Sequence, residues 1–397
     1  MSYHFNKRSA SFSRHSRPSN NNRGNRGPRA QYIDPAKFVK TATLIEAEEY
    51  VPKHSFTDFA ISQGLKNNLT AKGYVIPSPI QDQTIPAALE GKDILGIAST
   101  GTGKTAAFAV PILQKLTVDK NSAALIIAPT RELAQQIEQE CRELGKGSGL
   151  SGAVLIGGSS MGAQLRDLRH NPRIVIGTPG RIKDHIERRT LRLQHFDVVV
   201  LDEVDRMLDM GFINDVTTIL SELSQPRQSM FFSATMDTKI RNLISRFTED
   251  PFTVTLKATG GSENVHQNVV RYAGNIDRME KLHNILLKDE VQKVIVFDET
   301  QRNVERLSDE LLKRGFSAGA IHGGKTQGHR ERALAKFKKS EVTILVATDV
   351  AARGIDVADI THVINFSIPK AYDDYVHRIG RAGRAGKIGH ALTFINN

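Results

Sequence analysis

The sequence predicts an α/β protein with parallel sheets that are covered by helices on both faces. From about Phe56 onward, short and nearly continuous apolar runs alternate with helical stretches, and each run ends in Gly, Pro, Ser, Thr or Asp. This alternation is typical of buried parallel strands joined by helical crossovers. The chain has 397 residues, which is too long for one compact core of ordinary size. We therefore expect two domains.

The apolar runs identify the expected strands. In the first half of the chain they are DILGIAST, AALIIAPT, PRIVIGTPG, FDVVVLDE and SMFFSAT, and in the second half KVIVFDET, TILVATD, HVINFS and HALTFI. Around residues 249–268 the alternation is interrupted by Pro251 and the pair Gly260–Gly261. We therefore expect a first domain over residues 51–255, a linker over residues 256–267 and a second domain over residues 268–397.

The beginning of the chain has a different composition. Residues 1–30 contain Lys and Arg but no Asp or Glu, and they carry +7 of the chain's formal net charge of +11. They are rich in Ser, Asn and Gly and have little apolar surface to bury, which predicts a disordered basic arm over residues 1–50. The charge of this arm fits either contacts with an anionic partner or a solubilising tail.

Composition also excludes several classes of protein. No apolar run approaches the roughly 18 residues that cross a bilayer, and the amino terminus lacks the apolar centre of a secretory signal. Cys141 is the only cysteine, which excludes an internal disulfide and a cysteine-rich metal site. We expect a soluble protein in the cytoplasm, without a membrane partner.

The segment ASTGTGKT lies between a predicted strand and a predicted helix. Its glycines allow backbone N–H groups to surround a phosphate, Lys104 can reach the β- and γ-phosphates, and the Thr105 hydroxyl can ligate Mg²⁺. The sequence therefore predicts a nucleotide-phosphate site made of Ala98, Ser99, Thr100, Gly101, Thr102, Gly103, Lys104 and Thr105.

Two adjacent acids follow the apolar strand VVVL. Burying an unpaired carboxylate costs several kcal/mol, so Asp202 and Glu203 need a cation or solvent beside them. We predict that Asp202 holds Mg²⁺ through its water shell and that Glu203 orients and deprotonates the water that attacks the γ-phosphate. Asp205 lies too far along the chain to share this geometry, so we expect it to pair with a group across a cleft.

Taken together, the motifs resemble one family. GYVIPSPIQ, ASTGTGKT, APTRELAQQ, the glycines at 157–158, TPGR, DEVD, SAT, ARGID and HRIGRAGR are similar, in order and spacing, to the DEAD-box ATP-dependent RNA helicases of superfamily 2. The resemblance implies two tandem RecA-like domains of the P-loop NTPase type, with ATP and Mg²⁺ as ligands. It also implies a monomeric core that binds single-stranded and duplex RNA and opens duplexes locally.

The resemblance assigns roles to further residues. Phe56 and Gln81 resemble the family's contacts to adenine, and Asp356 resembles its ribose-side contact. Arg381 and Arg384 resemble arginine fingers, which with Lys104, Asp202 and Glu203 would form the catalytic set. The residues that resemble couplers between hydrolysis and the second domain are Asp205, Ser233, Thr235 and His377. Those that resemble RNA contacts are Thr130, Arg131, Gly158, Thr178, Arg181, Gln327, Arg330, Thr348 and Asp349.

Spacing and departures add three expectations. Arg378, Arg381 and Arg384 are spaced three residues apart, which predicts a single positive face toward the γ-phosphate. Val204 replaces the Ala of the usual DEAD motif, either filling core volume or crowding the catalytic acids. Asp298 stands where the family often has a small uncharged residue, which weakens the expected local RNA contact.

Two other functions compete with the helicase. One is an ATP-gated RNA clamp that seldom turns over, and the other is a nucleic-acid chaperone that acts through the basic arm with a vestigial ATPase. The sequence favours the enzyme, because Glu203 and both expected arginine fingers are present.

Overall fold

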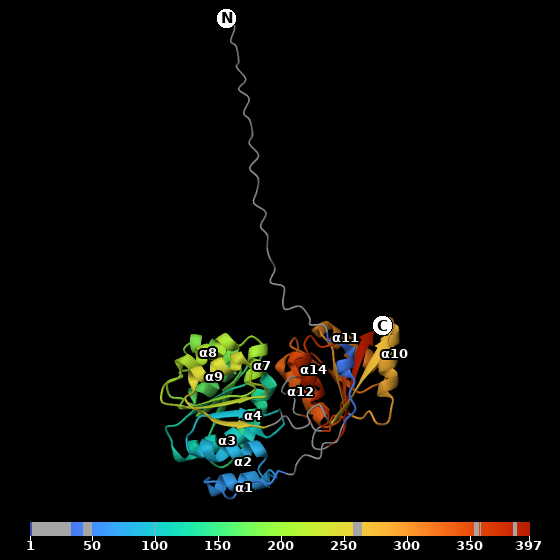
Figure 1. Ribbon diagram of the computed structural model, residues 1–397. Helices are drawn as coiled ribbons and strands as arrows, with labels where there is room; N and C mark the ends of the chain where they lie inside the picture. The colour runs from blue at the N-terminus through green and yellow to red at the C-terminus, as the bar shows by residue number, and fades with distance from the viewer. Residues whose placement is uncertain are drawn as a thin grey trace. The chain divides into compact units, whose positions relative to one another are not determined.

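The computed structural model describes Met1 and residues 33–42, 50–99, 101–256, 264–352, 357, 359–383 and 387–397. Between residues 33 and 397 it contains two parallel sheets, each packed against helices on both faces (Figure 1). The predicted α/β class is confirmed. None of the described helices is long and apolar enough to cross a bilayer.

The first sheet has seven strands in the order β3-β4-β2-β5-β6-β1-β7, and every described pair is parallel. The central strands are buried on both faces: Ile126 packs into one core cluster and Ile127 into the other. The strands are β1 (Ile94–Ile97), β2 (Ala124–Ile127), β3 (Gly152–Leu155), β4 (Ile174–Gly177), β5 (Val198–Leu201), β6 (Gln228–Ser233) and β7 (Phe252–Thr255).

The register brings the expected site residues together at the carboxyl ends of neighbouring strands. Ile97 pairs with Ser233, and Ile127 pairs with Leu201, so that β1, β2, β5 and β6 end side by side. Ligands of open α/β sheets bind beyond the carboxyl ends of the strands. The phosphate loop after β1 and the acids after β5 therefore lie close together at the carboxyl end of the sheet.

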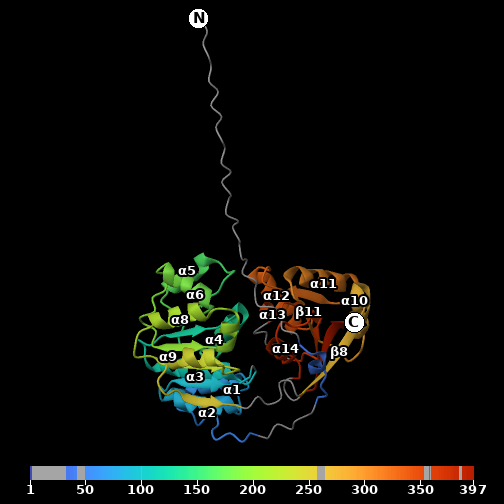
Figure 2. The ribbon, with the colours of Figure 1, turned by 45° about the horizontal axis from the view of Figure 1, so that its top comes forward.

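The helices of the first domain divide between the two faces of its sheet, as Figures 1 and 2 show. One face is covered by α1 (Gln63–Ala71), α2 (Pro79–Leu89), α3 (Lys104–Val118) and α4 (Arg131–Leu144). The other face is covered by α5 (Met161–Arg169), α6 (Pro179–Glu187), α7 (Val204–Asp209), α8 (Ile213–Glu222) and α9 (Thr238–Phe247). In α9, Ile240, Leu243 and Ile244 are buried at spacings of three and four, as in an amphipathic helix.

The second sheet has six strands in the order β10-β11-β9-β12-β13-β8, again with parallel pairs. The strands are β8 (Val265–Tyr272), β9 (Val294–Phe297), β10 (Ala318–Ile321), β11 (Ile344–Ala347), β12 (His362–Asn365) and β13 (Gly389–Asn396). One face packs against α10 (Gly274–Leu286) and α11 (Gln301–Lys313), and the other against α12 (Gln327–Lys338), α13 (Asp349–Ala352) and α14 (Tyr372–Ile379).

Two predicted boundaries differ from the structure. Strand β8 begins at Val265, so the second sheet starts inside the predicted linker, of which residues 257–263 lie outside the described part. The predicted arm extended to residue 50, but residues 33–42 form a short 3₁₀ helix, η1 (Pro35–Phe38), and pack against the second sheet. The prediction missed this because it was made from the composition of residues 1–30, which include neither Ile33 nor Phe38.

Candidate ATP and RNA sites

The phosphate loop joins the end of β1 to the start of α3. Gly101 and Gly103 have φ angles of 82° and 93°, in the left-handed region that glycine adopts without strain. A Cβ at Gly103 would lie 2.5 Å from Gln81 Nε2, so this position needs glycine for space as well. The loop thus turns directly into the amino terminus of α3, where free N–H groups favour an anion.

Lys104 occupies the first turn of α3 and is 6% exposed. Its Nζ donates to the Ala98 carbonyl oxygen at 2.9 Å, which holds the ammonium over the loop. The Thr102 hydroxyl donates to the Ser99 carbonyl oxygen at 2.8 Å and stabilises the same turn. These contacts stabilise the loop, and its binding of phosphate stays a prediction; Thr100 lies outside the described residues.

Gln81 connects helix α2 to the phosphate loop. Its Oε1 accepts from the Ser78 N–H at 2.9 Å, and its Nε2 donates to the Gly103 carbonyl oxygen at 3.0 Å. The Ser78 hydroxyl donates to the Thr102 carbonyl oxygen at 2.7 Å. A group that bound to the Gln81 amide would therefore affect the hydrogen bond between Gln81 and the phosphate loop.

Phe56, the other predicted adenine contact, lies in the core of the first domain. It is 5% exposed and packs edge-on against Phe59 and Tyr74, with ring centroids 5.7 and 5.6 Å away. Tyr74, rather than Phe56, lines the cavity beside the phosphate loop. Contact between Phe56 and adenine stays a prediction.

The acids after β5 lie where the phosphate loop ends. Asp202 is 2% exposed, and burial raises its pKa to about 7, with Lys104 opposing this rise and Glu203 adding to it. Its Oδ1 accepts from the Glu203 N–H at 3.0 Å. A carboxylate in this setting gains most from a nearby cation, because a cation favours its charged form.

Glu203 has an unusual backbone conformation. Its φ and ψ angles are both 55°, a left-handed conformation that costs a residue other than glycine on the order of 1–3 kcal/mol. It directly precedes α7 and is 6% exposed. Strain of this kind clusters at functional sites, where the surrounding structure enforces it.

Asp205 contacts the segment that follows β6. Its Oδ2 accepts from the Ala234 N–H at 3.2 Å and lies 3.4 Å from the Thr235 hydroxyl. The Ser233 hydroxyl donates to the Thr235 carbonyl oxygen at 2.7 Å, which fixes this turn. The third acid of the motif is thus tied to Thr235 as expected, whereas its coupling to the second domain stays a prediction.

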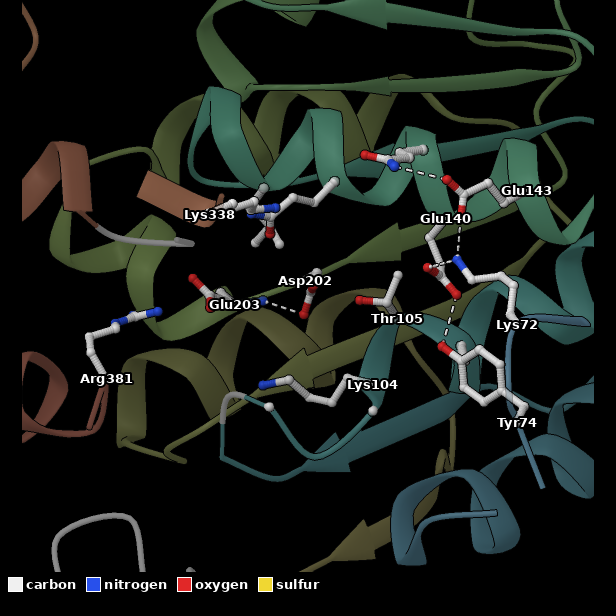
Figure 3. A pocket seen from close by; sticks show the side chains of 16 residues that line it. Lys72, Tyr74, Lys104, Thr105, Glu140, Glu143, Asp202, Glu203, Lys338 and Arg381 are labelled. Atoms are coloured by element: carbon white, nitrogen blue, oxygen red, sulfur yellow. Dashed lines mark hydrogen bonds and ion pairs between the residues drawn. The ribbon is translucent and has the colours of Figure 1, made fainter. Parts of the chain in front are cut away.

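The phosphate loop and the two acids after β5 line a cavity of about 370 Å³. Figure 3 shows the side chains around it. Lys104, Asp202 and Glu203 line it together with Arg381, which follows α14, and Lys338, which ends α12. The predicted arginine finger Arg381 and the predicted base Glu203 therefore face one space. Arg384 and Asp356 lie outside the described residues.

The sequence did not indicate one polar cluster in this cavity. Lys72 Nζ lies 2.6 Å from Glu140 Oε2 and 2.5 Å from Glu143 Oε2, and the Tyr74 hydroxyl donates to Glu140 Oε1 at 2.8 Å (Figure 3). The two acids are spaced as neighbours on α4, but their lysine partner comes from a distant part of the sequence. Only the three-dimensional contact identifies the cluster.

A second missed cluster lies beside Gln81. The Asp82 carboxylate is 2% exposed and accepts hydrogen bonds from the Tyr50 hydroxyl at 2.5 Å, the Lys53 N–H at 2.8 Å and His54 Nδ1 at 2.7 Å. Burial alone would raise the pKa of Asp82, and these hydrogen bonds outweigh it, so the pKa lies below its usual value. Asp82 thus anchors the chain before Phe56 to the helix that carries Gln81.

The predicted RNA contacts of the first domain gather around the glycines at 157–158. Gly158 has a φ angle of 78°, and a Cβ there would lie 2.2 Å from Arg131 Nη1, so the Arg131 guanidinium packs directly against this turn. Arg181 Nη1 donates to the Ser159 carbonyl oxygen at 3.4 Å. Thr130 and Thr178 immediately precede α4 and α6 as their N-cap residues.

The predicted RNA contacts of the second domain have protein partners. Gln327 Nε2 donates to Gln135 Oε1 at 2.8 Å, and Arg330 Nη2 lies 2.7 Å from Glu132 Oε2, with both members of this ion pair buried. Thr348 is buried, and its carbonyl oxygen accepts hydrogen bonds from the N–H groups of Ala351 and Ala352.

Arg378 corrects one prediction. Its Nε and Nη2 donate to the two carboxylate oxygens of Asp349 at 2.5 and 2.8 Å, and its Nη1 donates to the Ser367 carbonyl oxygen at 2.7 Å. Arg378 is 3% exposed, and it lines one small cavity together with Asp349 and Arg381. Its charge is paired with Asp349, so it adds no free positive charge to the predicted face, while Arg384 lies outside the described residues. Asp349 is correspondingly engaged in this ion pair.

Family models match both domains: a DEAD/DEAH box helicase over residues 78–243 and a helicase conserved C-terminal domain over residues 277–386. The ATP-dependent RNA helicase CshA of Limosilactobacillus reuteri is 45% identical over 342 residues, covering 86% of this chain and 69% of that protein. The chain belongs to the DEAD-box family of ATP-dependent RNA helicases. The resemblance seen in the motifs is confirmed.

Further similar proteins agree with this family and with its fold. CshA of Bacillus subtilis strain 168 is 44% identical over 345 residues, or 86% of this chain and 69% of that one. Dbp5 of S. cerevisiae, solved with RNA and ADP BeF3, has a TM-score of 0.75 at 27% identity, covering 86% of this chain and 90% of that one. Mss116p, solved with ssRNA and AMP-PNP, has a TM-score of 0.75 at 31% identity, covering 85% and 73%. The predicted pair of RecA-like domains is confirmed.

Val204 and Asp298, which both depart from the usual DEAD-box motifs, are buried. Val204 is fully buried in the core cluster behind the acids. Asp298 is 5% exposed, and its Oδ1 accepts from the Glu299 N–H at 2.7 Å. Burial lowers the pKa of Arg278, and the charge of Asp298 opposes this lowering; the Arg278 guanidinium lies 3.7 Å from the Phe366 ring centre. Asp298 therefore has a cationic neighbour inside the second domain.

The burial of Val204 predicts that it fills core volume in this DEAD-box protein. Val204→Ala removes two buried methyl groups, so we expect the free energy of unfolding to fall by about 1–2 kcal/mol. We expect little change in ATP turnover. Urea unfolding and an RNA-stimulated ATPase assay measure the two quantities. A large gain in turnover without lost stability would show instead that the valine restrains the acids.

Proposed function

We propose that this DEAD-box protein hydrolyses ATP in the cavity between Lys104, Glu203 and Arg381 and uses the cycle to open short RNA duplexes. The single observation that carries the proposal is that the phosphate loop, the strained acid after β5 and an arginine of the second domain line one space. Each of these three groups could have a purely structural role. Phosphoryl transfer, however, depends on positioning and on charge stabilisation, and the three groups together in one cavity can supply both.

The residues have distinct roles in this proposal. Lys104 and the N–H groups at the start of α3 hold the β- and γ-phosphates. Glu203 accepts a proton from the attacking water, for which its position beside the cavity is suited. Arg381 stabilises the charge that develops on the γ-phosphoryl oxygens. Arg384 would assist from the same segment.

Asp202 and Thr105 are the proposed holders of Mg²⁺. Asp202 supplies a carboxylate whose pKa is raised by burial, and Thr105 supplies a hydroxyl in the same cavity. Mg²⁺ typically takes one or two carboxylates together with substrate phosphates and waters, and this donor set fits. When bound, the ion would neutralise charge on the β- and γ-phosphates.

RNA would bind to both domains through its backbone. In the first domain Arg131 and Arg181 lie next to the turn at 157–159, where small residues allow a strand to approach. Thr130 and Thr178 cap the helices beside it, and their helix amino termini favour phosphate. In the second domain the proposal uses Gln327, Arg330, Thr348 and Asp349, whose present protein contacts would have to adjust.

Duplex opening would follow because a strand bent across two domains cannot stay paired, and hydrolysis would release it. Asp205 and Thr235 would report the state of the ATP site to the second domain, with Ser233 fixing their turn and His377 as the receiving side chain. We place this activity in a monomeric core. We also place it in a reducing, cytoplasmic setting, which fits a sequence with Cys141 as its single cysteine.

Strand displacement tests the proposal. A short RNA duplex with a single-stranded overhang is mixed with the full chain, with ATP or with a non-hydrolysable analogue, and the released labelled strand is measured. We expect release that requires ATP and is absent with a DNA duplex of the same sequence. A stable ATP-dependent complex without release would indicate an RNA clamp. Annealing that is independent of ATP would indicate a chaperone.

A further inference from the structure

The segment before the first domain belongs structurally to the second. Phe38 is fully buried in the cluster that also contains Val265, Tyr375 and Ile379. Its ring centroid lies 4.7 Å from that of Tyr375 at an interplanar angle of 61°, an edge-to-face contact. Figure 2 shows this segment, in blue, beside β8.

Backbone hydrogen bonds fix the position of the segment. The Lys40 N–H donates to the Gln267 carbonyl oxygen at 3.0 Å, and the Gln267 N–H donates to the Lys40 carbonyl oxygen at 2.8 Å. These bonds form an antiparallel bridge to β8, the edge strand of the second sheet. The Ala42 N–H also donates to His266 Nδ1 at 3.1 Å. The segment thus covers an edge that would otherwise present unpaired backbone groups.

The same segment packs against α14. Tyr375 is fully buried between Phe38 and the sheet, and its hydroxyl donates to Gln267 Oε1 at 2.9 Å. The Lys37 ammonium lies 5.5 Å from the ring centre of Tyr372 on the same helix. Helix α14 therefore contacts residues 37–38 as well as the sheet.

The position of α14 sets that of Arg381. The helix ends at Ile379, and the following turn continues with the Arg381 N–H donating to the Arg378 carbonyl oxygen at 3.2 Å. Ala382 is 1% exposed in the Phe38 cluster, and a Cβ at Gly383 would lie 2.9 Å from the Asn264 carbonyl oxygen. Arg381 is thus held on both sides by backbone that packs tightly, and a shift of α14 would move it.

We propose that Phe38 is a positioning residue for ATP hydrolysis: it holds α14 in place and, through α14, the guanidinium of Arg381 in the ATP cavity. An arginine that stabilises a transition state must be placed accurately, since a misplacement of about 1 Å can cost roughly 10²-fold in rate. Removal of the ring leaves a cavity under α14 that neighbouring groups fill only in part. The inference rests on the proposed role of Arg381.

The test compares variants of the full chain under saturating RNA and ATP. We expect Phe38→Ala to lower kcat roughly 10- to 100-fold, with binding of a fluorescent ATP analogue unchanged. Phe38→Leu keeps apolar volume and the fold, and we expect a smaller loss of kcat. Val39→Ala is the matched control, because Val39 is 57% exposed and neighbours Phe38. Thermal melting establishes that each variant is folded at the assay temperature.

A double-mutant cycle separates positioning from general stability. Hydrolysis by Arg381→Ala is measured first in a single-turnover assay. An unchanged rate would contradict the proposed function itself. If Phe38 acts through Arg381, adding Phe38→Ala to Arg381→Ala lowers the rate little further. Losses that multiply, or folded Phe38 variants with a normal kcat, would overturn the positioning role and leave the proposed function standing.

Discussion

Replacing Glu203 with glutamine is expected to slow ATP hydrolysis by about 10²- to 10⁴-fold, the usual contribution of a general base. Glutamine keeps the size of the side chain and adopts the same left-handed backbone at similar cost, but it cannot accept the proton of the attacking water. Binding of ATP and RNA should therefore persist, giving a long-lived complex. Single-turnover hydrolysis and RNA binding in the presence of ATP measure the two parts.

The control for this variant is Glu222→Gln, an exposed acid at the end of α8. It makes the same chemical change far along the chain from the motif, and we expect normal hydrolysis. Turnover by Glu203→Gln at the normal rate would remove Glu203 from the role of base. In that case the strain at its backbone would need another explanation.

Arg381→Ala is expected to have the largest effect of all. Arginine fingers typically contribute about 10³ to 10⁵ in rate, because they meet charge that exists only in the transition state. We expect RNA-stimulated hydrolysis to fall by this order, while the affinity for ATP changes much less. The phosphate loop and Gln81 lie in the first domain and do not depend on Arg381 for their structure.

Arg302→Ala is a suitable control, since Arg302 is an exposed arginine on α11 of the same domain. The comparison uses the same RNA at several ionic strengths, so that a general loss of positive charge is separated from the loss of the finger. Equal and small effects of the two substitutions would contradict an ATP site completed by the second domain.

The sequence predicted the interior of both sheets better than their edges. All nine apolar runs are strands, and the four strands that were not predicted, β3, β7, β8 and β10, are the edges of the two sheets. An edge strand has a partner on one side only and needs fewer apolar residues. In β7 only Val254 is buried, and β10 contains Ala and Gly. Such strands become visible only through their pairing.

The candidate site shows a similar division. The phosphate loop and the acids were predicted from local sequence because each follows directly from a strand. The role of Arg378 was predicted from spacing alone, which does not reveal that its charge is paired with Asp349. The clusters around Asp82 and Lys72 join residues that are distant in sequence, so no local pattern could reveal them. The docking of residues 33–42 joins them to β8 and α14, which lie far along the chain, so their composition did not reveal it.

The docking of residues 33–42 also has a consequence for synthesis on the ribosome. The first domain is inserted between two pieces of the second, and Phe38 precedes its partner Tyr375 by 337 residues. At about 5–20 residues per second, translation leaves the Phe38 ring without that partner for roughly 17–70 s. The first domain can fold during this interval, whereas the second closes its core only once strand β13 has emerged. Residues 33–42 are thus made before the first domain but reach their final contacts only after it.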